Sequence, residues 1–423
     1  FVREMDRISQ LPDSVVHHIL SFVNTRPDLV RMSVLSKTWF HLTASFPILN
    51  FNIRKFRSRE SFFKYVEYTT SRFCHHSIIP AHKLKLKLKL CATILVPAEL
   101  DIVNRCLQLL LNKGVKVLVI DVTNSSESPK YRLPNILLSV SMLESLTICG
   151  CDLSSSFMLD ALRFKSLIKL KLEYVPLDVE VIKYLATSCP LLQQFHIGCC
   201  SGLNRVCLYG HQNLQTLLIY YDTPLERIDV EAPNLSSLVI IDEEESGAPR
   251  MNLASCKKLT SVAYMGHPLP NSNGFTNFLS YFPFIENFYL ATTYNCKNFK
   301  LSSRSLRTLM LHSVCDFELS EFNTPNLVLF AYPCDVSSFL PMVRNSTRPT
   351  THLKPSMQCY PDDSIDALWF QKLRLLLNNK NGFKVLNLYI HTIHSQKFTD
   401  IEKLKAIELP PYELEHVELQ LDT

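Results

Sequence analysis

The segment that decides the fold is Leu143-Glu-Ser-Leu146-Thr-Ile148, in which apolar residues occupy the first, fourth and sixth positions. The same hexamer recurs at Leu167-Ile-Lys-Leu170-Lys-Leu172 and at Leu306-Arg-Thr-Leu309-Met-Leu311. Its registers begin at Val115, Leu143, Leu167, Leu192, Leu214, Leu235, Leu259, Ile285, Leu306, Leu327, Phe383 and Leu414. From Leu143 to Leu327, nine registers span 184 residues with a mean spacing of 23. One such hexamer arises by chance, but this series indicates an internal repeat.

Proline supports the same registers independently. Pro190, Pro233, Pro283 and Pro325 each stand two residues before the first apolar position of a hexamer. The proline ring stops a helix and favours extended backbone before it, so each return segment closes where a strand begins. The spacing lies in the leucine-rich-repeat range of about 20–29 residues. We therefore predict an α/β repeat solenoid whose strands form a parallel sheet on the concave face, preceded by a small all-α region.

Composition excludes several classes of function. The 423 residues are 47% hydrophobic and 20% charged, as in folded proteins. Only 9 residues are glycine and no two are separated by a single residue, which excludes the glycine-rich nucleotide loops. The 14 cysteines contain no C-x-x-C pair, so we expect free thiols and no metal site. No catalytic residues can be assembled from spacing, and we expect neither enzymatic activity nor a cofactor.

The charge pattern gives weaker signals. A net charge of +5 is too dilute to make nucleic acid an expected partner. Two basic clusters, at residues 54–59 and 83–89, could contact phosphates or an acidic protein surface, but the favoured interpretation is a solvated face. We expect no basic cluster among the concave strand positions. The sequence shows neither a membrane span nor a secretory signal, which favours a cytoplasmic or nuclear location.

The N-terminal region predicts short helices. Between Leu11 and Val23 the apolar residues follow one helical face, with Pro12 in the first turn and Asp13 near the positive end of the helix dipole. Thr25 and Asp28 can cap a second short helix, which ends before the polar segment at residues 36–38. Three short helices cannot bury much surface alone, so this region needs a partner.

Three segments carry a resemblance to a known family: residues 6–13 (DRISQLPD), 19–22 (ILSF) and 33–39 (SVLSKTW). Together they resemble an F-box of the plant F-box/leucine-rich-repeat type, over residues 6 to about 47. The resemblance implies that these helices bind the Skp adaptor of cullin-RING ubiquitin ligases. Carried over by position, the adaptor-binding residues would be Leu11, Pro12, Val16, Ile19, Leu20, Leu35 and Trp39. Thr38 departs from the family, which usually has a basic residue there; the alternative is that the helices only cap the solenoid.

The C-terminal region breaks the repeat period and then resumes it. A predicted helix at residues 365–377 followed by the hexamer at Phe383 echoes the helix at residues 101–111 followed by the hexamer at Val115. The last strand, from Leu414, resembles the FBD region that ends many plant F-box proteins. The predicted domains are an F-box (1–52), a linker or first cap (53–82), the repeat solenoid (83–349) and an FBD-like capping module (350–423).

The residues between the apolar hexamer positions point away from the core, because side chains of a strand alternate between faces. In the middle and later repeats these positions are apolar. We take them as a hypothetical substrate-binding stripe consisting of Leu218, Tyr220, Val239, Ile241, Met265, Tyr289 and Met310. Strand propensity, long loops or the C-terminal module could equally account for them.

The sequence thus predicts an interaction protein, the substrate-recognition subunit of a cullin-RING (SCF-type) ubiquitin ligase. Its partners would be a Skp-type adaptor, through it a cullin, and a protein target, with no membrane. One alternative is a small-molecule receptor of the hormone type, for which a deep pocket and a basic cluster would be needed. Another is a leucine-rich-repeat binding module without ubiquitin-ligase coupling.

Overall fold

The structure is a computed structural model that describes most of the repeat region and part of each end. The described residues are 8, 11–22, 31–76, 82–88, 95–122, 131–134, 141–153, 164–177, 181–182, 188–243, 248–266, 281–291, 300–312, 321–332, 356–359, 385–391 and 416–422. The chain forms two compact units, Phe1–Leu203 and Asn204–Thr423.

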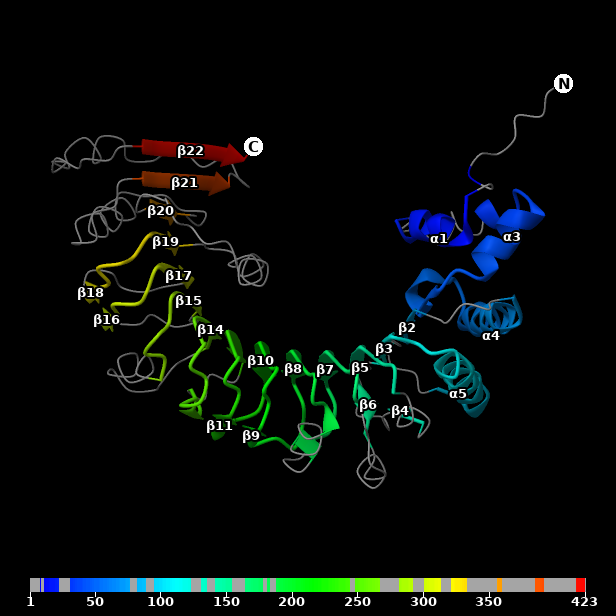
Figure 1. Cartoon of the computed structure of the whole chain (residues 1–423), viewed down its shortest axis with the longest axis horizontal. Coiled ribbons are helices and arrows are strands. Elements are labelled where there is room, and N and C mark those ends of the chain that lie inside the picture. The colour runs from blue at the N-terminus through cyan, green and yellow to red at the C-terminus, as the bar shows by residue number, and fades with distance from the viewer. Residues whose placement is uncertain are drawn as a thin grey trace. The chain divides into compact units, whose positions relative to one another are not determined.

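The α-helices of the first unit whose bounds lie within the described residues are α1 (Asp13–Ser21), α3 (Lys37–Ala44), α4 (Arg59–His76) and α5 (Pro97–Leu111) (Figure 1). Local sequence explains where they begin. The Ser36 side chain accepts a hydrogen bond from the Trp39 backbone N–H and so caps α3. Pro97 opens α5 at a position that needs no N–H donor, and Glu99 accepts a hydrogen bond from the Val96 backbone N–H.

Six described strands, all parallel, form the main sheet of the first unit. In order they are β1 (Ile48–Asn52), β2 (Lys83–Lys87), β3 (Val117–Asp121), β5 (Ser145–Cys149), β7 (Lys169–Glu173) and β8 (Gln194–Gly198) (Figure 1). The strands are in phase, so that Leu49, Leu84, Leu118, Leu146, Leu170 and Phe195 form one row. Two short strands, β4 (Tyr131–Arg132) and β6 (Cys151–Asp152), pair separately.

The second unit continues the same construction with nine described strands in its main sheet. They are β10 (Thr216–Tyr221), β12 (Ser237–Asp242), β14 (Ser261–Met265), β15 (Asn287–Ala291), β17 (Thr308–His312), β19 (Leu329–Tyr332), β20 (Ser356–Cys359), β21 (Val385–His391) and β22 (His416–Asp422). Two smaller parallel sheets consist of β9 (Arg205–Leu208), β11 (Arg227–Val230) and β13 (Arg250–Asn252), and of β16 (Lys300–Ser302) and β18 (Glu321–Asn323).

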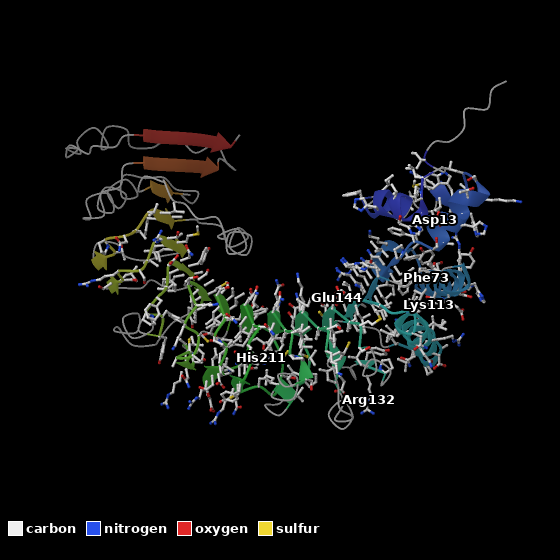
Figure 2. All side chains as sticks on the ribbon, in the orientation of Figure 1. Asp13, Phe73, Lys113, Arg132, Glu144 and His211 are labelled. Atoms are coloured by element: carbon white, nitrogen blue, oxygen red, sulfur yellow. The ribbon has the colours of Figure 1, made fainter. Side chains whose placement is uncertain are left out.

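Consecutive repeats are joined by the same backbone contact. Glu144, a residue labelled in Figure 2, shows this contact. Its backbone carbonyl oxygen accepts hydrogen bonds from the N–H groups of Ile168 (2.8 Å) and Lys169 (3.1 Å). The carbonyl oxygen of Thr260 accepts hydrogen bonds from the N–H groups of Glu286 and Asn287 in the same way. This contact satisfies the polar groups of the turn that leads into each strand.

The core lies on one face of each sheet, where the hexamer residues are buried. Leu143, Leu146 and Ile148 are at most 1% exposed. Burying one leucine side chain contributes about 1.5–3 kcal/mol to the stability of the fold. Because every repeat buries the apolar residues of one hexamer, the repeats together form a continuous core. We call the opposite face, formed by the residues between them, the second face of the sheet.

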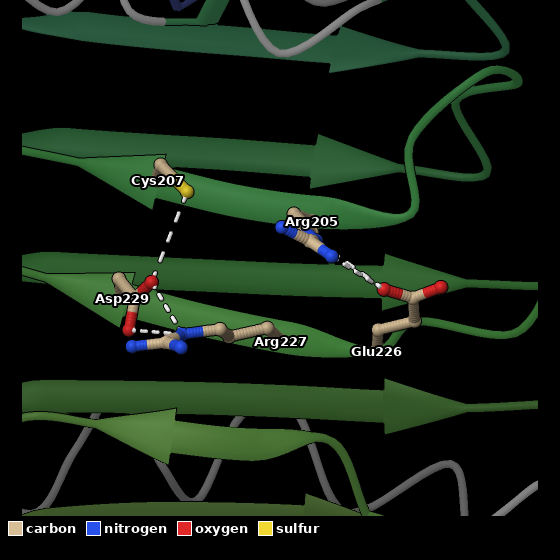
Figure 3. A network of polar contacts seen from close by, with 5 residues as sticks. All are labelled: Arg205, Cys207, Glu226, Arg227 and Asp229. Carbon is tan, nitrogen blue, oxygen red and sulfur yellow. Dashed lines mark hydrogen bonds and ion pairs between the residues drawn. The ribbon is translucent and has the colours of Figure 1, made fainter.

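The small sheet of β9, β11 and β13 carries a polar network (Figure 3). Arg205, Arg227 and Arg250 occupy one register across the three strands. Arg205 forms an ion pair with Glu226 (3.1 Å) and Arg227 with Asp229 (2.6 Å). These acids offset the repulsion between arginines on neighbouring strands.

All twelve predicted hexamers lead into a strand that begins two residues after their first apolar residue, which confirms the solenoid. The sheet begins earlier than predicted, because β1 lies inside the region assigned to 1–52 and β2 starts at the predicted boundary. Residues 53–82 were expected to be a linker or cap, and they contain the 18-residue helix α4. β20 was not predicted. The expected helix at 365–377, and Thr25 and Asp28, lie outside the described residues.

Candidate functional site

The N-terminal helices have a small hydrophobic core of their own. Val16 and Leu20 from α1 pack with Trp39 and Leu42 from α3 and with Phe46, and all five are buried. His17 is also buried, and its Nε2 lies 3.1 Å from the Leu42 carbonyl oxygen and 3.3 Å from Ser45 Oγ. These contacts hold α1 against α3.

Helix α1 carries a second apolar stripe that this core does not cover. Leu11, Val15, Ile19 and Phe22 lie four, four and three residues apart, and their side chains are 38%, 42%, 40% and 70% exposed. Such spacing places Val15, Ile19 and Phe22 on one side of the helix, and Leu11 lies just before the N-cap residue Pro12. Val34 and Leu35, in the turn before α3, are exposed as well. A helix that only caps a solenoid needs one apolar face, so the second stripe indicates a partner surface.

The structure divides the seven residues expected to bind an adaptor. Val16, Leu20 and Trp39 are buried in the helical core, whereas Leu11, Pro12, Ile19 and Leu35 are exposed. The buried three can act only by shaping the surface. Val15, Phe22 and Val34 are exposed as well and were not among the predicted residues, although the spacing from Leu11 to Phe22 was a readable signal.

Helix α4 fixes the N-terminal helices to the repeats. The Arg72 guanidinium lies 3.8 Å from the centre of the Phe40 ring. It also donates hydrogen bonds to the Phe40 carbonyl oxygen and to Thr43 Oγ1. On the other side of α4, Arg59 forms an ion pair with Glu99 of α5. A stacked and hydrogen-bonded arginine constrains the angle between packed elements more than apolar contact alone.

The second face of the first unit is polar and basic. Strand β2 presents Lys83, Lys85 and Lys87 there, because its leucines face the core. This corrects the expectation that no basic cluster occupies these strand positions. The series KLKLK resembles a charged surface segment, but the alternating leucines make it a strand of the sheet.

Further along the same face a network surrounds Glu173. Its carboxylate accepts a hydrogen bond from Lys171 Nζ (2.7 Å), lies 3.3 Å from His196 Nε2, and is 3.3 Å from Cys149 Sγ. Burial raises the pKa of Glu173, but the hydrogen bond and charge of Lys171 outweigh burial, so the pKa lies below its usual value. Burial and the nearby carboxylate raise the pKa of the Cys149 thiol to about 12, which keeps it unreactive.

The second face of the second unit is apolar. One cross-strand row consists of Leu218, Val239, Ala263, Tyr289, Met310 and Ala331, and the next consists of Tyr220, Ile241, Met265 and Ala291. Val239, Ala263, Tyr289 and Ala291 form a buried cluster, against which Leu218, Ile241, Met265 and Met310 pack. Tyr220 donates a hydrogen bond to Glu243. The predicted stripe therefore exists as one surface, but Val239 and Tyr289 in it are buried rather than exposed.

Other kinds of site do not emerge from the described residues. Among them no group of three histidine, cysteine or acidic side chains could hold a metal ion. In the same ranges no helix has the length and apolar character needed to cross a membrane. The nine cysteines whose side chains the structure describes are free thiols.

Comparison with known proteins bears directly on this arrangement. Residues 8–51 match the F-box domain family, and residues 103–277 match the family described as "FBD-associated F-box protein At5g56370, LRR repeats". The chain carries an F-box followed by leucine-rich repeats, as plant F-box/leucine-rich-repeat proteins do. The F-box match covers α1, α3 and nearly all of β1, and so includes both apolar stripes of α1.

Curated relatives from Arabidopsis thaliana agree. F-box/LRR-repeat protein 25 is 25% identical over 248 residues, which is 57% of this chain and 88% of that protein. Putative F-box/LRR-repeat protein At5g54820 is 28% identical over 55% of this chain, and Putative F-box protein At3g58860 is 28% identical over 59%. These matches span about half the length of the latter two proteins, 51% and 54%. They support a substrate-adaptor role in general for this F-box protein, and a Skp-type adaptor as the kind of partner that an F-box binds.

Proposed function

We propose that this chain is the substrate-recognition subunit of an SCF-type ubiquitin ligase. The observation that carries the proposal is the second apolar stripe of α1, which is exposed while the helix already packs its own core through Val16 and Leu20. Together with Val34 and Leu35, this stripe would bind the Skp-type adaptor, and the adaptor would connect the chain to a cullin. Exposed apolar residues clustered on two adjacent elements gain free energy when a protein partner removes them from water.

The second unit would capture the target protein. The residues available for this role are the half-buried ones at the edge of the apolar cluster: Leu218, Tyr220, Ile241, Met265 and Met310. Val239 and Tyr289 would support them from within. A contact surface that rests on a packed cluster is preorganised, which reduces the entropic cost of binding.

The mechanism would be proximity rather than chemistry. Holding a target lysine near a ubiquitin-charged enzyme converts a bimolecular transfer into an effectively intramolecular one, which can lower the barrier by several kcal/mol. Arg72 would contribute by fixing the F-box helices to α4, since a fixed angle preserves the position of the adaptor relative to the first repeats.

Co-purification with a Skp-type adaptor in reducing buffer tests the proposal. Ile19→Glu should abolish capture, because it places a carboxylate in the middle of the stripe. Leu109→Glu is the matched control: Leu109 is also a helical apolar residue, and the two are 40% and 39% exposed. Leu109 lies on α5, outside the F-box, so its variant should bind like the natural chain.

Capture by both variants would overturn the role of the stripe, and no capture by the natural chain would overturn the ubiquitin-ligase proposal. Circular dichroism should show the same helix content and melting temperature for both variants, because neither substitution touches a buried residue. A Leu20→Ala variant provides the contrasting case, in which binding is lost together with the fold of the helices.

A further inference from the structure

Three lysines form a straight row on the second face of the first unit. Lys83, Lys85 and Lys87 alternate along β2 with Leu84 and Leu86, whose side chains are fully buried in the core. Alternate residues of a strand lie about 6.6 Å apart, so the row is about 13 Å long. We call these three residues the lysine row.

The lysine row has no polar partner among the residues that the structure describes. Among the described residues, none of its three ammonium groups forms a hydrogen bond or an ion pair, whereas Lys116 and Lys171 of the same unit are paired with acids. All three side chains are half-buried. Burial, followed by the charges of Lys83 and Lys87, lowers the pKa of Lys85. The positive charges are therefore concentrated and partly desolvated, and no described acid forms an ion pair with them, unlike the charges of an ordinary solvated surface.

The neighbouring strands indicate the kind of ligand. The flanking positions are Ile48, Asn50 and Asn52 on β1, and Val117, Val119 and Asp121 on β3. The single acid among them, Asp121, is buried. These six positions contain no aromatic ring on which a nucleic-acid base could stack. The side-chain amides of Asn50 and Asn52 can form hydrogen bonds with the backbone of a polypeptide, and the lysine ammonium groups can pair with its carboxylates.

We propose that the lysine row binds an acidic, extended segment of a protein partner. An extended chain repeats its side chains with the same period as β2, so carboxylates at alternate positions match the three ammonium groups one to one. A single phosphate group could contact only part of a row of this length. The proposal rests on the proposed function only in assigning the segment to the captured protein, because binding to the row does not need the adaptor.

The test uses the full chain and fluorescence anisotropy with two labelled peptides of equal composition. One is a decapeptide of alternating glutamate and threonine, and the other has all its glutamates in one block. The triple variant Lys83→Gln, Lys85→Gln, Lys87→Gln removes the row. The control Lys64→Gln, Lys165→Gln, Lys257→Gln removes three exposed lysines elsewhere and gives the same net charge.

We expect the natural chain to bind the alternating peptide more tightly than the block peptide. The row variant should bind it about tenfold more weakly or worse, while the control changes by less than about twofold. Equal losses in both triple variants, or equal affinity for both peptides, would overturn the proposal in favour of unspecific charge attraction. Tighter binding of tripolyphosphate or of a ten-nucleotide oligothymidine would also overturn it.

Adaptor capture separates this proposal from the previous one. The row variant should bind the Skp-type adaptor like the natural chain, since the lysine row lies outside the exposed stripe of α1. Peptide binding by a chain that fails to capture the adaptor would leave the lysine row supported and the ubiquitin-ligase proposal refuted. The opposite result would refute the lysine row alone.

Discussion

The second faces of the two units differ although their core faces follow one pattern. In Phe1–Leu203 the central row runs Asn50, Lys85, Val119, Thr147, Lys171 and His196. In Asn204–Thr423 the corresponding row runs Leu218, Val239, Ala263, Tyr289, Met310 and Ala331. Leucine at the hexamer positions holds both sheets together, and the residues between them are free to vary. Such positions can therefore encode partner chemistry without changing the fold.

A charge introduced on the second face should give the largest difference in stability between the two units. Tyr289→Asp places a carboxylate among Val239, Ala263 and Met310 and removes a ring that is 4% exposed, so we expect a loss of about 4 kcal/mol in the free energy of unfolding. Thr147→Asp, beside Lys171 in the first unit, should cost less than about 0.5 kcal/mol. Urea denaturation measures both, and hydrogen exchange at β15 localises the first. Equal losses of unfolding free energy in the two variants would contradict the difference between the two second faces.

Overpacking should give a smaller difference. Ala263 is fully buried between Val239 and Tyr289, so Ala263→Leu should destabilise the second unit by about 2 kcal/mol. Thr147→Leu in the first unit is the counterpart, and its half-buried position should accept the larger side chain almost without cost. Thermal unfolding of the two variants provides the measurement. An unchanged melting temperature for Ala263→Leu would contradict this prediction, because it would show that the neighbouring side chains rearrange to accommodate the leucine.

The polar network of the first unit should respond to pH. Glu173→Gln removes the carboxylate that Lys171 and His196 share, at a cost of about 1 kcal/mol at pH 7. Because the pKa of Glu173 is lowered by folding, its stabilisation is present above the unfolded value of about 4.3 and is lost as pH falls through the folded value. The gap in melting temperature between natural chain and variant should close between pH 7 and pH 3. A constant gap would contradict this assignment.

The lysine row should show the smallest effect. Lys85→Met keeps a stem of similar length and removes a charge repelled by Lys83 and Lys87, so we expect a gain of about 0.5 kcal/mol at neutral pH. Folding lowers the pKa of Lys85, so its cost is present at neutral pH and disappears as pH rises toward the unfolded value of about 10.4. Melting curves at pH 7 and pH 10 check this. A loss of stability at pH 7 would mean that the ammonium group has a compensating partner.

The strands were predictable because their signal is local. Each hexamer needs only six residues and a spacing of about 23, and the twelve registers from Val115 to Leu414 all became strands. Two missed strands carry the same signal in weaker form, since β1 lies in Phe46-Pro-Ile-Leu49-Asn-Phe51 and β2 in Ala81-His-Lys-Leu84-Lys-Leu86. The proline in the first segment and the alternating lysines in the second made these two strands harder to predict.

The binding residues of the F-box were only partly predictable. Helix α1 has two apolar stripes, and a sequence cannot show which of them packs on α3. The structure assigns Val16 and Leu20 to the core and leaves Leu11 and Ile19 exposed. This assignment depends on Leu42 and Phe46, more than twenty residues away along the chain.

The sequence by itself determined the repeat, its period, the core positions and the resemblance to F-box proteins, because each depends on spacing between near neighbours. Only the tertiary structure decided which apolar stripe of α1 is exposed, that Tyr289 and Val239 are buried, and that Lys83, Lys85 and Lys87 stand together without a polar partner among the described residues. Those properties depend on side chains brought into register from separate repeats. Burial and charge are set by such neighbours in space, and a sequence lists neighbours only along the chain.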